Sequence, residues 1–378
     1  MRYRKFGKLD YQASVLGFGT MRLPVLDGDG SKVDEAQASA LIRYAIDHGV
    51  NYVDSAYGYH GGNSEVAVGK ALADGYRDRV KLVTKLPPWS IKTAADIDRV
   101  FNEQLQRLRT GKIDFYLLHC LNNANWEMLR GFGVLQWAEK MTAKGAIGGL
   151  GFSCHESTSD FCRYLDEYDG WALCQIQYNY MDQTNQAGTQ GLEYAGAKGV
   201  PVVVMEPLRG GKLAVEPPPA VRAVWDSAPV RRTPADWGLQ WVWNHPEVVV
   251  ALSGMNALRQ VQENLASAEH AAANSLRPEE LSLYGRVIEA YGQARPVPCN
   301  SCGYCQPCPN GVNVPRIFEI YNESPLYADF GVPRYIYGKL EASARADKCK
   351  ACHECEEKCP QKIEIAKVLA EAHEKLKG

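Results

Sequence analysis

The chain has 378 residues, of which 46% are hydrophobic and 23% are charged, and its formal net charge is −2. These values exclude collagen, a coiled coil and a fully disordered chain, and they leave no basic excess for nucleic acid or anionic lipid. No apolar run approaches the ~20 residues of a membrane span, and none follows the basic N-terminus as in a signal peptide, so we expect a soluble cytoplasmic protein without a nucleic-acid or membrane partner. At about 100–200 residues per domain, the length predicts two or three domains, or one large barrel with an appendage.

Short apolar runs alternate with helical stretches from residue 1 to about 275. The predicted strands are Val15–Gly19, Asn51–Ser55, Lys81–Leu86, Asp114–Cys120, Ile147–Ser153, Ala172–Tyr178, Val202–Glu206 and Val248–Gly254. The predicted helices are Asp34–Asp47, Ser64–Ala73, Ala94–Arg109, Trp126–Ala143, Ser157–Tyr168, Gln186–Ala197, Pro234–Trp243 and Ala257–His270. The strands are often apolar throughout, which is typical of parallel strands buried on both faces. Eight strand–helix units in a row predict an α/β fold whose parallel sheet closes as a (β/α)8 TIM barrel.

Two features of this region leave alternatives open. An open doubly wound sheet would carry Gly-x-Gly-x-x-Gly after an early strand, but Gly17-Phe18-Gly19 lacks the third glycine and no helix follows directly. This pattern counts against an open dinucleotide-binding fold. The segment 210–232, which contains Pro217-Pro218-Pro219, interrupts the rhythm after the seventh strand. A long loop on this face of a barrel is either a substrate lid or a plain irregular connection.

Ionisable residues stand at the ends of three consecutive predicted strands. Asp54 lies near the end of the second strand, Lys85 on the third and His119 on the fourth, and Tyr59 follows Asp54 by five residues. Polar residues at the carboxyl ends of barrel strands line the active site. A lysine cation lowers the pKa of a nearby tyrosine from about 10, a carboxylate holds the lysine charged, and a histidine orients a carbonyl or shares the proton. The set predicts a general acid for hydride reduction, with the hydride supplied by a cofactor.

These residues lie in motifs that resemble the aldo-keto reductases. The motifs are Asn51-Tyr-Val-Asp-Ser-Ala-Tyr-Gly-Tyr59, Asn63-Ser64-Glu65, Gly69-Lys70-Ala71-Leu72, Val83-Thr84-Lys85, Asp114-Phe-Tyr-Leu-Leu-His119 and Gly151-Phe152-Ser153. The resemblance covers residues 1 to about 275 and implies a barrel with a catalytic tetrad of Asp54, Tyr59, Lys85 and His119. Tyr59 is the implied general acid. Tyr57 competes for that role, but the family's spacing from the aspartate favours Tyr59, and His60 is an extra titratable neighbour.

The same resemblance implies contacts with NADP(H) or NAD(H). It places Ser153 and Gln175 at the nicotinamide carboxamide, and Glu263 and Asn264 at the adenine end. Ser253-Gly254 would meet phosphate near the start of the last helix, where free N–H groups favour anions. The chain departs from the family at Cys154, where asparagine is usual, at Met205, where an aromatic is common, and at Gln260, where an arginine grips the 2′-phosphate. NADPH, NADH and a flavin such as FMN therefore remain alternatives.

Eight of the 12 cysteines lie in two motifs near the C-terminus. The first is Cys299-x-x-Cys302-x-x-Cys305-x-x-Cys308-Pro309, and the second is Cys349-x-x-Cys352-x-x-Cys355-x-x-x-Cys359-Pro360. Triple runs that end in Cys-Pro favour iron–sulfur ligation. Structural zinc, which uses Cys-x-x-Cys knuckles separated by a longer loop, is the competing interpretation, and disulfides are disfavoured in a reducing compartment.

Eight thiols suffice for two [4Fe–4S] clusters. If the fourth cysteine of each run serves the other cluster, as in two-cluster ferredoxins, the first cluster takes Cys299, Cys302, Cys305 and Cys359, and the second takes Cys349, Cys352, Cys355 and Cys308. A helix is predicted from Pro315, and the tail 362–377 has the apolar spacing of a core-facing helix. We expect a barrel over 1–275, a helical connection over 276–295 and a ferredoxin-like domain over 296–378.

The leading hypothesis is an iron–sulfur member of the aldo-keto reductases. It would exchange hydride between a nicotinamide cofactor and a small-molecule carbonyl or alcohol, and its clusters would exchange electrons with a redox partner protein. The alternative is an electron-transfer or flavin-linked protein on a barrel scaffold, with structural clusters and no carbonyl turnover.

Overall fold

The computed structural model describes residues 1–299, 301–326 and 330–378. The chain divides into two compact units. The first comprises Met1–Gly210 and Ala235–Leu276, and the second comprises Gly211–Pro234 and Arg277–Gly378.

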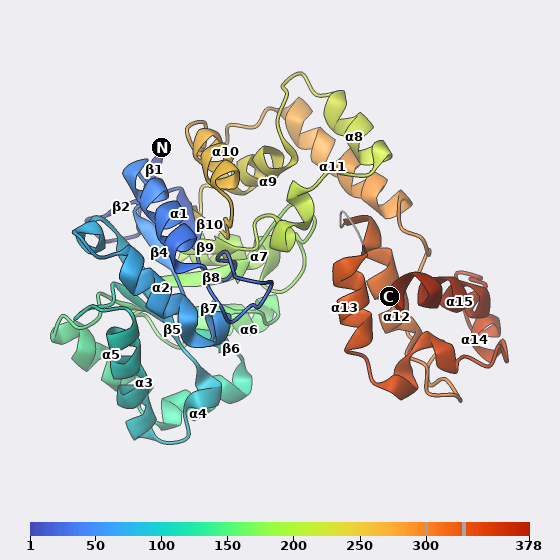
Figure 1. Ribbon diagram of the computed structural model, residues 1–378, viewed down its shortest axis with the longest axis horizontal. Helices are drawn as coiled ribbons and strands as arrows, with labels where there is room; N and C mark the ends of the chain where they lie inside the picture. The colour runs from blue at the N-terminus through green and yellow to red at the C-terminus, as the bar shows by residue number, and fades with distance from the viewer. Residues whose placement is uncertain (300, 327–329) are drawn as a thin grey trace. The chain divides into compact units, whose positions relative to one another are not determined.

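The first unit is a closed barrel of eight parallel strands, which confirms the predicted fold class (Figure 1). Its strands are β3 (Leu16–Gly19), β4 (Tyr52–Asp54), β5 (Lys81–Leu86), β6 (Phe115–Leu121), β7 (Leu150–Cys154), β8 (Leu173–Gln177), β9 (Val202–Met205) and β10 (Val248–Ser253). Each strand pairs with the next in sequence, and β10 closes the ring on β3. Because all strands run the same way, their carboxyl ends meet at one mouth of the barrel.

Helices surround the strands and bury their apolar faces on them. They are α1 (Glu35–Asp47), α2 (Asn63–Ala71), α3 (Ala94–Arg107), α4 (Asn123–Gly131), α5 (Val134–Ala143), α6 (Thr158–Asp166), α7 (Gly188–Ala197), α9 (Pro234–Trp243) and α10 (Leu258–Ala268). The buried positions of α1, which include Ala38, Leu41 and Ala45, recur at helical spacing. Thr93 and Asp96 form a capping box that fixes the start of α3.

The amino end of the barrel is closed by a hairpin that the sequence did not predict. Its strands, β1 (Tyr3–Lys5) and β2 (Gln12–Ser14), pair antiparallel and are only three residues long. Phe6, in the turn between them, is fully buried, and its ring lies 4.8 Å from that of Phe115. The hairpin therefore plugs the end of the barrel opposite the strand carboxyl ends.

The predicted helix Trp126–Ala143 was wrong as a single element. The structure has two helices, α4 and α5, and Gly133 between them adopts φ +73°. A left-handed residue ends an α-helix, and glycine reaches this conformation without steric cost. The apolar pattern continues across the break because both helices face the same core, so periodicity alone did not reveal it.

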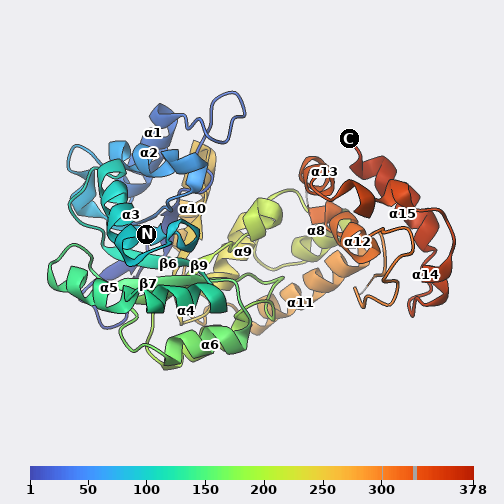
Figure 2. The ribbon, with the colours of Figure 1, turned by 90° about the horizontal axis from the view of Figure 1, so that it is seen from below.

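The second unit is helical. It contains α8 (Pro219–Asp226), α11 (Pro278–Gln293), α12 (Val314–Asn322), α13 (Gly331–Gly338), α14 (Glu354–Glu357) and α15 (Ile365–Leu376). Figures 1 and 2 both show α8 alongside α11. The rings of Trp225 and Tyr284 meet at 5.3 Å across this contact, and Arg232 pairs with the buried carboxylate of Glu280. The segment 210–232, which has no regular element in the sequence-based prediction, thus contains a helix that packs within this unit.

The helices after α11 have a hydrophobic core of their own. Ile317 and Phe318 of α12 and Ile365 and Leu369 of α15 are buried in it. The prediction that the C-terminal tail is a core-facing helix is confirmed by the burial of α15.

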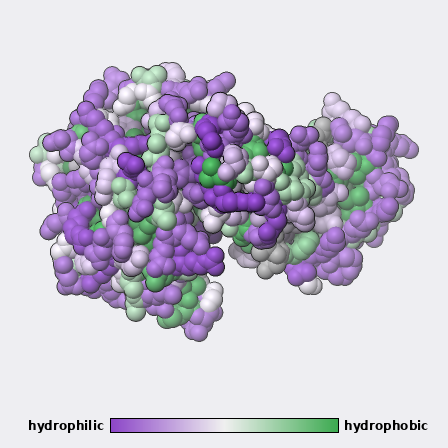
Figure 3. Space-filling view, turned by 90° about the horizontal axis from the view of Figure 1, so that it is seen from above, coloured by the Kyte–Doolittle hydropathy of each residue, from purple (hydrophilic) through white to green (hydrophobic). Residues whose placement is uncertain are grey.

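The face drawn in Figure 3 is largely hydrophilic, with apolar residues in small scattered groups. Among the described residues, no helix has both the length and the apolarity that crossing a membrane requires.

Candidate active site and cysteine loops

Three strand ends and one turn bring the predicted catalytic residues to the same mouth of the barrel. Asp54 is the last residue of β4, Lys85 lies near the end of β5, and His119 lies near the end of β6. The parallel register pairs Asp54 with Val83, and Lys85 with Leu117. Tyr59 begins the short turn η1 (Tyr59–Gly62) that follows β4.

Lys85 and Asp54 form a buried ion pair. The distance from Nζ to Oδ1 is 2.7 Å, and Nζ also donates a hydrogen bond of 2.7 Å to the main-chain oxygen of Ser55. Burial acts to lower the pKa of Lys85, but Asp54 and Tyr59 together raise it above its ordinary value. Lys85 is therefore a cation that two acceptors hold in one place.

Tyr59 lies beside this cation. Its ring centroid is 5.1 Å from Nζ of Lys85 and 6.1 Å from the imidazole of His119, which it meets edge-on at 83°. Burial raises the pKa of Tyr59, and Lys85 lowers it by a smaller amount. This net rise is opposite to the direction expected from the lysine alone, because the phenol is withdrawn from water as well as placed beside a charge. The phenol is consequently protonated at neutral pH, which is the form that a general acid requires.

His119 is a neutral imidazole with an unsatisfied ring nitrogen. Burial and then the charge of Lys85 lower its pKa to about 3. Its Nδ1 atom is buried without a hydrogen-bond partner, as are Oδ2 of Asp54 and Oε1 of Gln175. Buried polar atoms are normally paired, so such atoms at the strand ends indicate a site that receives a polar ligand.

The two residues that competed with Tyr59 or neighbour it face elsewhere. The hydroxyl of Tyr57 donates to Glu103 at 3.0 Å, on the outer side of the barrel. The imidazole of His60 accepts from the main-chain nitrogen of Leu23 at 3.1 Å, and its other nitrogen lies 2.7 Å from the oxygen of Gly30. Neither group is directed at the Lys85–Asp54 pair.

An exposed tryptophan beside the site escaped the sequence analysis. Trp89 is 59% exposed, and its ring lies 5.2 Å from that of His119. It belongs to the turn η3 (Pro88–Ser90) that follows β5. Its position four residues beyond Lys85 was the available signal, since loops at this end of a barrel line the site.

The residues expected at the nicotinamide carboxamide lie on adjacent strands. Ser153 and Gln175 are paired in the register of β7 and β8, and both are buried. The Ser153 hydroxyl accepts from the main-chain nitrogen of Cys120 at 2.9 Å. Gln175 approaches the sulfur of Met205 at 3.8 Å and leaves its own oxygen unpaired.

The residues expected at phosphate and adenine divide into two groups. Asn264 donates to Ser253 at 3.0 Å in a buried contact, and Gly254 lies next to Ser253 under the side chain of Arg22. Glu263, in contrast, forms a surface ion pair with Arg259, with the two atoms 2.6 Å apart. The structure therefore groups Ser253, Gly254 and Asn264 together and leaves Glu263 outside the group.

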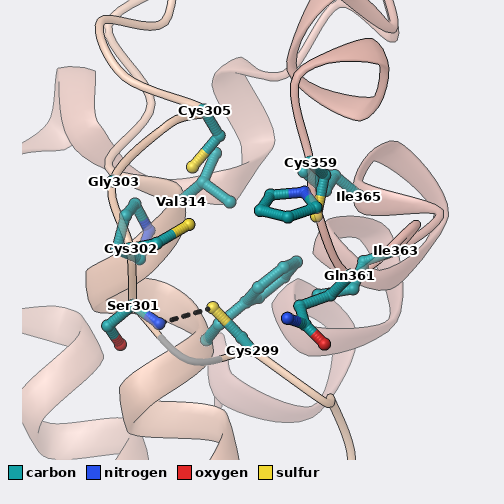
Figure 4. A pocket seen from close by; sticks show the side chains of 13 residues that line it. Cys299, Ser301, Cys302, Gly303, Cys305, Val314, Cys359, Gln361, Ile363 and Ile365 are labelled. Atoms are coloured by element: carbon teal, nitrogen blue, oxygen red, sulfur yellow. Dashed lines mark hydrogen bonds between the residues drawn. The ribbon is translucent and has the colours of Figure 1, made fainter.

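Four of the cysteines surround one pocket. Figure 4 shows three of them, Cys299, Cys302 and Cys305, on a single loop, with Cys359 across from them. The pocket is partly open to solvent, and apolar side chains such as Ile363 complete its wall. These are the four thiols that the exchanged ligand pattern assigns to one cluster.

The second cysteine loop repeats the backbone of the first. Ser301 and Ala351, each two residues after the first cysteine of its loop, have φ of +58° and +51°. Gly303 and His353, each two residues further on, have φ of +79° and +62°. In both loops the main-chain N–H two residues after the first cysteine donates to its sulfur, at 3.4 and 3.5 Å. Cysteines of both motifs, Cys308 among them, pack on the hydrophobic core of this unit.

The arrangement of the thiols bears on the competing interpretations. Every described cysteine is a free thiol, so no disulfide links the described part of the chain. Within that part, no three His, Cys, Asp or Glu side chains lie close enough to hold a single metal ion. Four thiols around one pocket are the number that a [4Fe–4S] cluster takes as ligands.

A closed parallel barrel with an aspartate, a lysine, a tyrosine and a histidine together at its mouth is typical of oxidoreductases built on a barrel. Residues 15–275 match the Aldo/keto reductase family, and residues 298–364 match the 4Fe-4S dicluster domain. The chain therefore belongs to the aldo/keto reductase family and carries an iron–sulfur domain after its barrel. It is an oxidoreductase of the aldo-keto reductase type.

Named reductases and a solved reductase structure are similar to about 70–80% of this chain. The 6-dehydroglucose reductase of Novosphingobium aromaticivorans is 26% identical and covers 78% of this chain and 97% of its own. The methylglyoxal reductase YeaE of Escherichia coli is 28% identical over 69% of this chain and 87% of its own. A Klebsiella pneumoniae aldo-keto reductase in complex with NADPH is 28% identical, with a TM-score of 0.60 over 75% of this chain and 93% of that one.

Proposed function

We propose that the protein reduces a small-molecule carbonyl, or oxidises the corresponding alcohol, with NADP(H) or NAD(H), and that it belongs to the subgroup with a C-terminal ferredoxin-like domain. The observation that carries this proposal is the buried Lys85–Asp54 pair beside the rings of Tyr59 and His119. The relatives are named as reductases of carbonyl compounds, which agrees with it.

The side chains divide the work of proton transfer. Bound nicotinamide would supply or accept the hydride. The Tyr59 hydroxyl gives its proton to the carbonyl oxygen, and the adjacent Lys85 ammonium stabilises the phenolate that remains. Asp54 holds Lys85 in place, and neutral His119 orients the carbonyl by a hydrogen bond. In alcohol oxidation the phenolate takes the proton back.

The buried atoms without partners fit a nicotinamide cofactor. The free oxygen of Gln175, next to Ser153, matches the needs of a carboxamide, which both donates and accepts hydrogen bonds. Ser253 and Gly254 precede α10, whose first turn offers free N–H groups that favour phosphate, and Asn264, inside α10, donates to Ser253. Because Arg259 is paired with Glu263, NADPH and NADH are both proposed as cofactors, with Glu263 at the adenine end. FMN is the alternative cofactor, and a flavin analysis of the purified protein tests for it.

The cysteine loops are proposed to hold two [4Fe–4S] clusters with exchanged fourth ligands. Cys299, Cys302, Cys305 and Cys359 would hold one cluster, since they share a pocket. By the repeated loop geometry, Cys349, Cys352 and Cys355, with Cys308, would hold the other. Cys302 and Cys352 are exposed, so both clusters would reach the surface of the unit and exchange electrons with a redox partner protein.

The Tyr59→Phe substitution tests the catalytic assignment. It removes the proton donor and leaves the ring, so we expect the reduction kcat to fall about 10²- to 10⁴-fold while the cofactor Kd stays within about twofold. Tyr57→Phe is the matched control, because its hydroxyl faces Glu103. Methylglyoxal and a panel of sugar aldehydes serve as substrates. Full activity of Tyr59→Phe would refute the assignment.

Metal analysis of anaerobically purified protein tests the clusters. We expect about eight iron and eight sulfide per chain, and Cys359→Ser and Cys308→Ser should each disturb a different cluster, seen as different losses in the electron paramagnetic resonance spectrum. Cys162→Ser, on α6 and outside both motifs, is the control. Zinc in place of iron, or the same spectral change in both variants, would contradict the proposed ligand sets.

A further inference from the structure

A buried ion pair lies outside the barrel, behind the strand that carries Lys85. Glu65 of α2 is fully buried, and its Oε2 atom accepts from the guanidinium of Arg107, at the end of α3, at 3.2 Å. Burial raises the pKa of Glu65, and its hydrogen-bond partners and Arg107 oppose this rise. None of the chemistry proposed above uses this pair, although every polar atom around it is engaged.

One side of the pair is tied to the strand that carries Lys85. The Oε1 atom of Glu65 accepts from Thr84 at 2.6 Å and from Gln104 at 2.8 Å. The amide nitrogen of the same Gln104 donates to the main-chain oxygen of Lys85 at 3.0 Å. The Tyr116 hydroxyl donates to the amide oxygen of Gln104 at 2.6 Å. All of these side chains are fully buried, so the backbone at Thr84 and Lys85 is held by a closed set of hydrogen bonds.

The other side of the pair is tied to the turn that carries Tyr59. Arg107 donates to the main-chain oxygen of Tyr57 at 3.2 Å, and its guanidinium lies 4.3 Å from the centre of the Tyr57 ring. It also packs on Gly62, where a side chain would come within 3.1 Å of the guanidinium nitrogen. Tyr59 stands between these two points of contact, so Arg107 holds its turn from both ends.

We propose that Glu65 and Arg107 are positioning residues that fix the separation between the Tyr59 hydroxyl and the Lys85 ammonium. The Glu65–Arg107 pair holds the backbone of Lys85 through Thr84 and Gln104. It holds the turn of Tyr59 through Tyr57 and Gly62. This inference rests on the proposed function, in which Tyr59 transfers a proton beside Lys85. A displacement of about 1 Å at a reacting group costs about 10²-fold in rate, so a rigid link of this kind has a direct effect on turnover.

The ionisation of Tyr59 reports the separation independently of turnover. The charged or titratable groups that face it are Lys85, Asp54, Cys120 and His119. Of these, Lys85 favours the phenolate. If the two groups move apart, the phenolate loses this support and the pKa of Tyr59 rises further.

The barrel contains a matched pair for comparison. Arg77 bonds to the buried carboxylate of Asp114 at 2.8 Å and to main-chain oxygens of Lys112 and Val80. The Arg77 side chain is 22% exposed, as is that of Arg107. Arg77 bonds to residues that precede β5 and β6, whereas the guanidinium of Arg107 reaches the turn that follows β4. Arg77→Lys therefore measures the general cost of disturbing such a pair.

The test compares Glu65→Gln, Arg107→Lys and Arg77→Lys in the full-length protein. NMR of protein labelled at the tyrosine ζ-carbons gives the Tyr59 titration, with its resonance identified by loss in Tyr59→Phe. We expect a higher Tyr59 pKa and a 10- to 100-fold lower kcat in the first two variants, with the cofactor KM within twofold, and no change of the Tyr59 pKa in Arg77→Lys. Added guanidinium should restore part of the kcat of Arg107→Ala.

The outcomes separate this inference from the proposed function. An unchanged Tyr59 titration and kcat in folded Glu65→Gln and Arg107→Lys would overturn the positioning role, even if the wild type reduces carbonyls. A shift of equal size in Arg77→Lys would overturn it too. If the wild type has no turnover, the proposed function fails, and the titration still decides whether the pair sets the Tyr59–Lys85 separation.

Discussion

At the scale of single residues, burial and neighbouring charge set the proton state of each group at the barrel mouth. Tyr59 is protonated and His119 is neutral because both are withdrawn from water, while Lys85 keeps its charge because Asp54 and Ser55 accept from it. A neutral imidazole next to a cation is a hydrogen-bonding group for a carbonyl and not a proton reservoir.

This arrangement predicts the pH dependence of carbonyl reduction. His119 gains a proton only near its pKa of about 3, and Tyr59 loses its proton only above its ordinary value of about 10. The kcat of reduction should therefore be flat between about pH 5 and pH 9, as checked by a pH–rate profile at saturating cofactor. An inflection near pH 6.5 that disappears in His119→Asn would show that the histidine titrates during turnover.

The sequence identified these residues because strand ends in a barrel converge, so Asp54, Lys85 and His119 were predictable from their places in the alternation. The direction of the Tyr59 pKa was not predictable, since it depends on how deeply packing buries the phenol. The pair of Glu65 and Arg107 was also hidden, because 42 residues separate them and each alone has an ordinary place on a helix.

At the scale of elements, α2 and α3 approach each other closely at a glycine. A β-carbon on Gly69 would lie 2.5 Å from the main-chain oxygen of Arg107 and 2.7 Å from the carbonyl carbon of Leu108. Backbone atoms cannot move aside as a flexible side chain does, so the two helices would have to separate. Gly69 thereby keeps the end of α3, and Arg107 with it, close to α2.

Gly69→Ala should consequently destabilise the barrel, by about 1–3 kcal/mol or more. Gly131→Ala is the matched control, because a side chain there on α4 would meet nothing within 4 Å and alanine favours a helix by about 0.5–1 kcal/mol. Thermal unfolding followed by circular dichroism measures both. Equal Tm values for the two variants would show that α2 and α3 can move apart freely.

Helices and strands were predicted correctly where a single run of apolar spacing coincided with a single helix or strand. The eight barrel strands follow from their apolar runs, whereas the β1–β2 hairpin was missed because three-residue strands carry no readable period. The α4–α5 break was missed because Gly133 interrupts the backbone without interrupting the apolar stripe. Both differences arise from local backbone geometry, which hydrophobic spacing does not encode.

At the scale of the whole molecule, the two units have separate cores and separate means of stabilisation. The barrel buries a continuous apolar sheet, while the second unit packs its cysteine loops onto a small helical core. Clusters bound by those loops would cross-link segments of the chain that lie as far apart as Cys299 and Cys359, 60 residues, and metal binding of this kind contributes to folding.

Removal of iron should therefore affect the two units unequally. We expect treatment with a chelator and an oxidant to lower or abolish the calorimetric transition of the second unit, and to leave the Tm of the barrel transition within a few degrees. Differential scanning calorimetry before and after treatment, with iron content measured in parallel, checks this. An equal shift of both transitions would mean that the units unfold together.

The placement of Gly211–Pro234 has a consequence for attempts to isolate the reductase barrel. This segment leaves the barrel after β9 and returns at α9, yet its helix α8 packs on α11. A fragment ending at Leu276 would retain α8 without that cover, so Val221 and Trp225, now buried, would face water and promote aggregation. Excising the barrel cleanly requires two cuts, with a short polar bridge in place of residues 211–234.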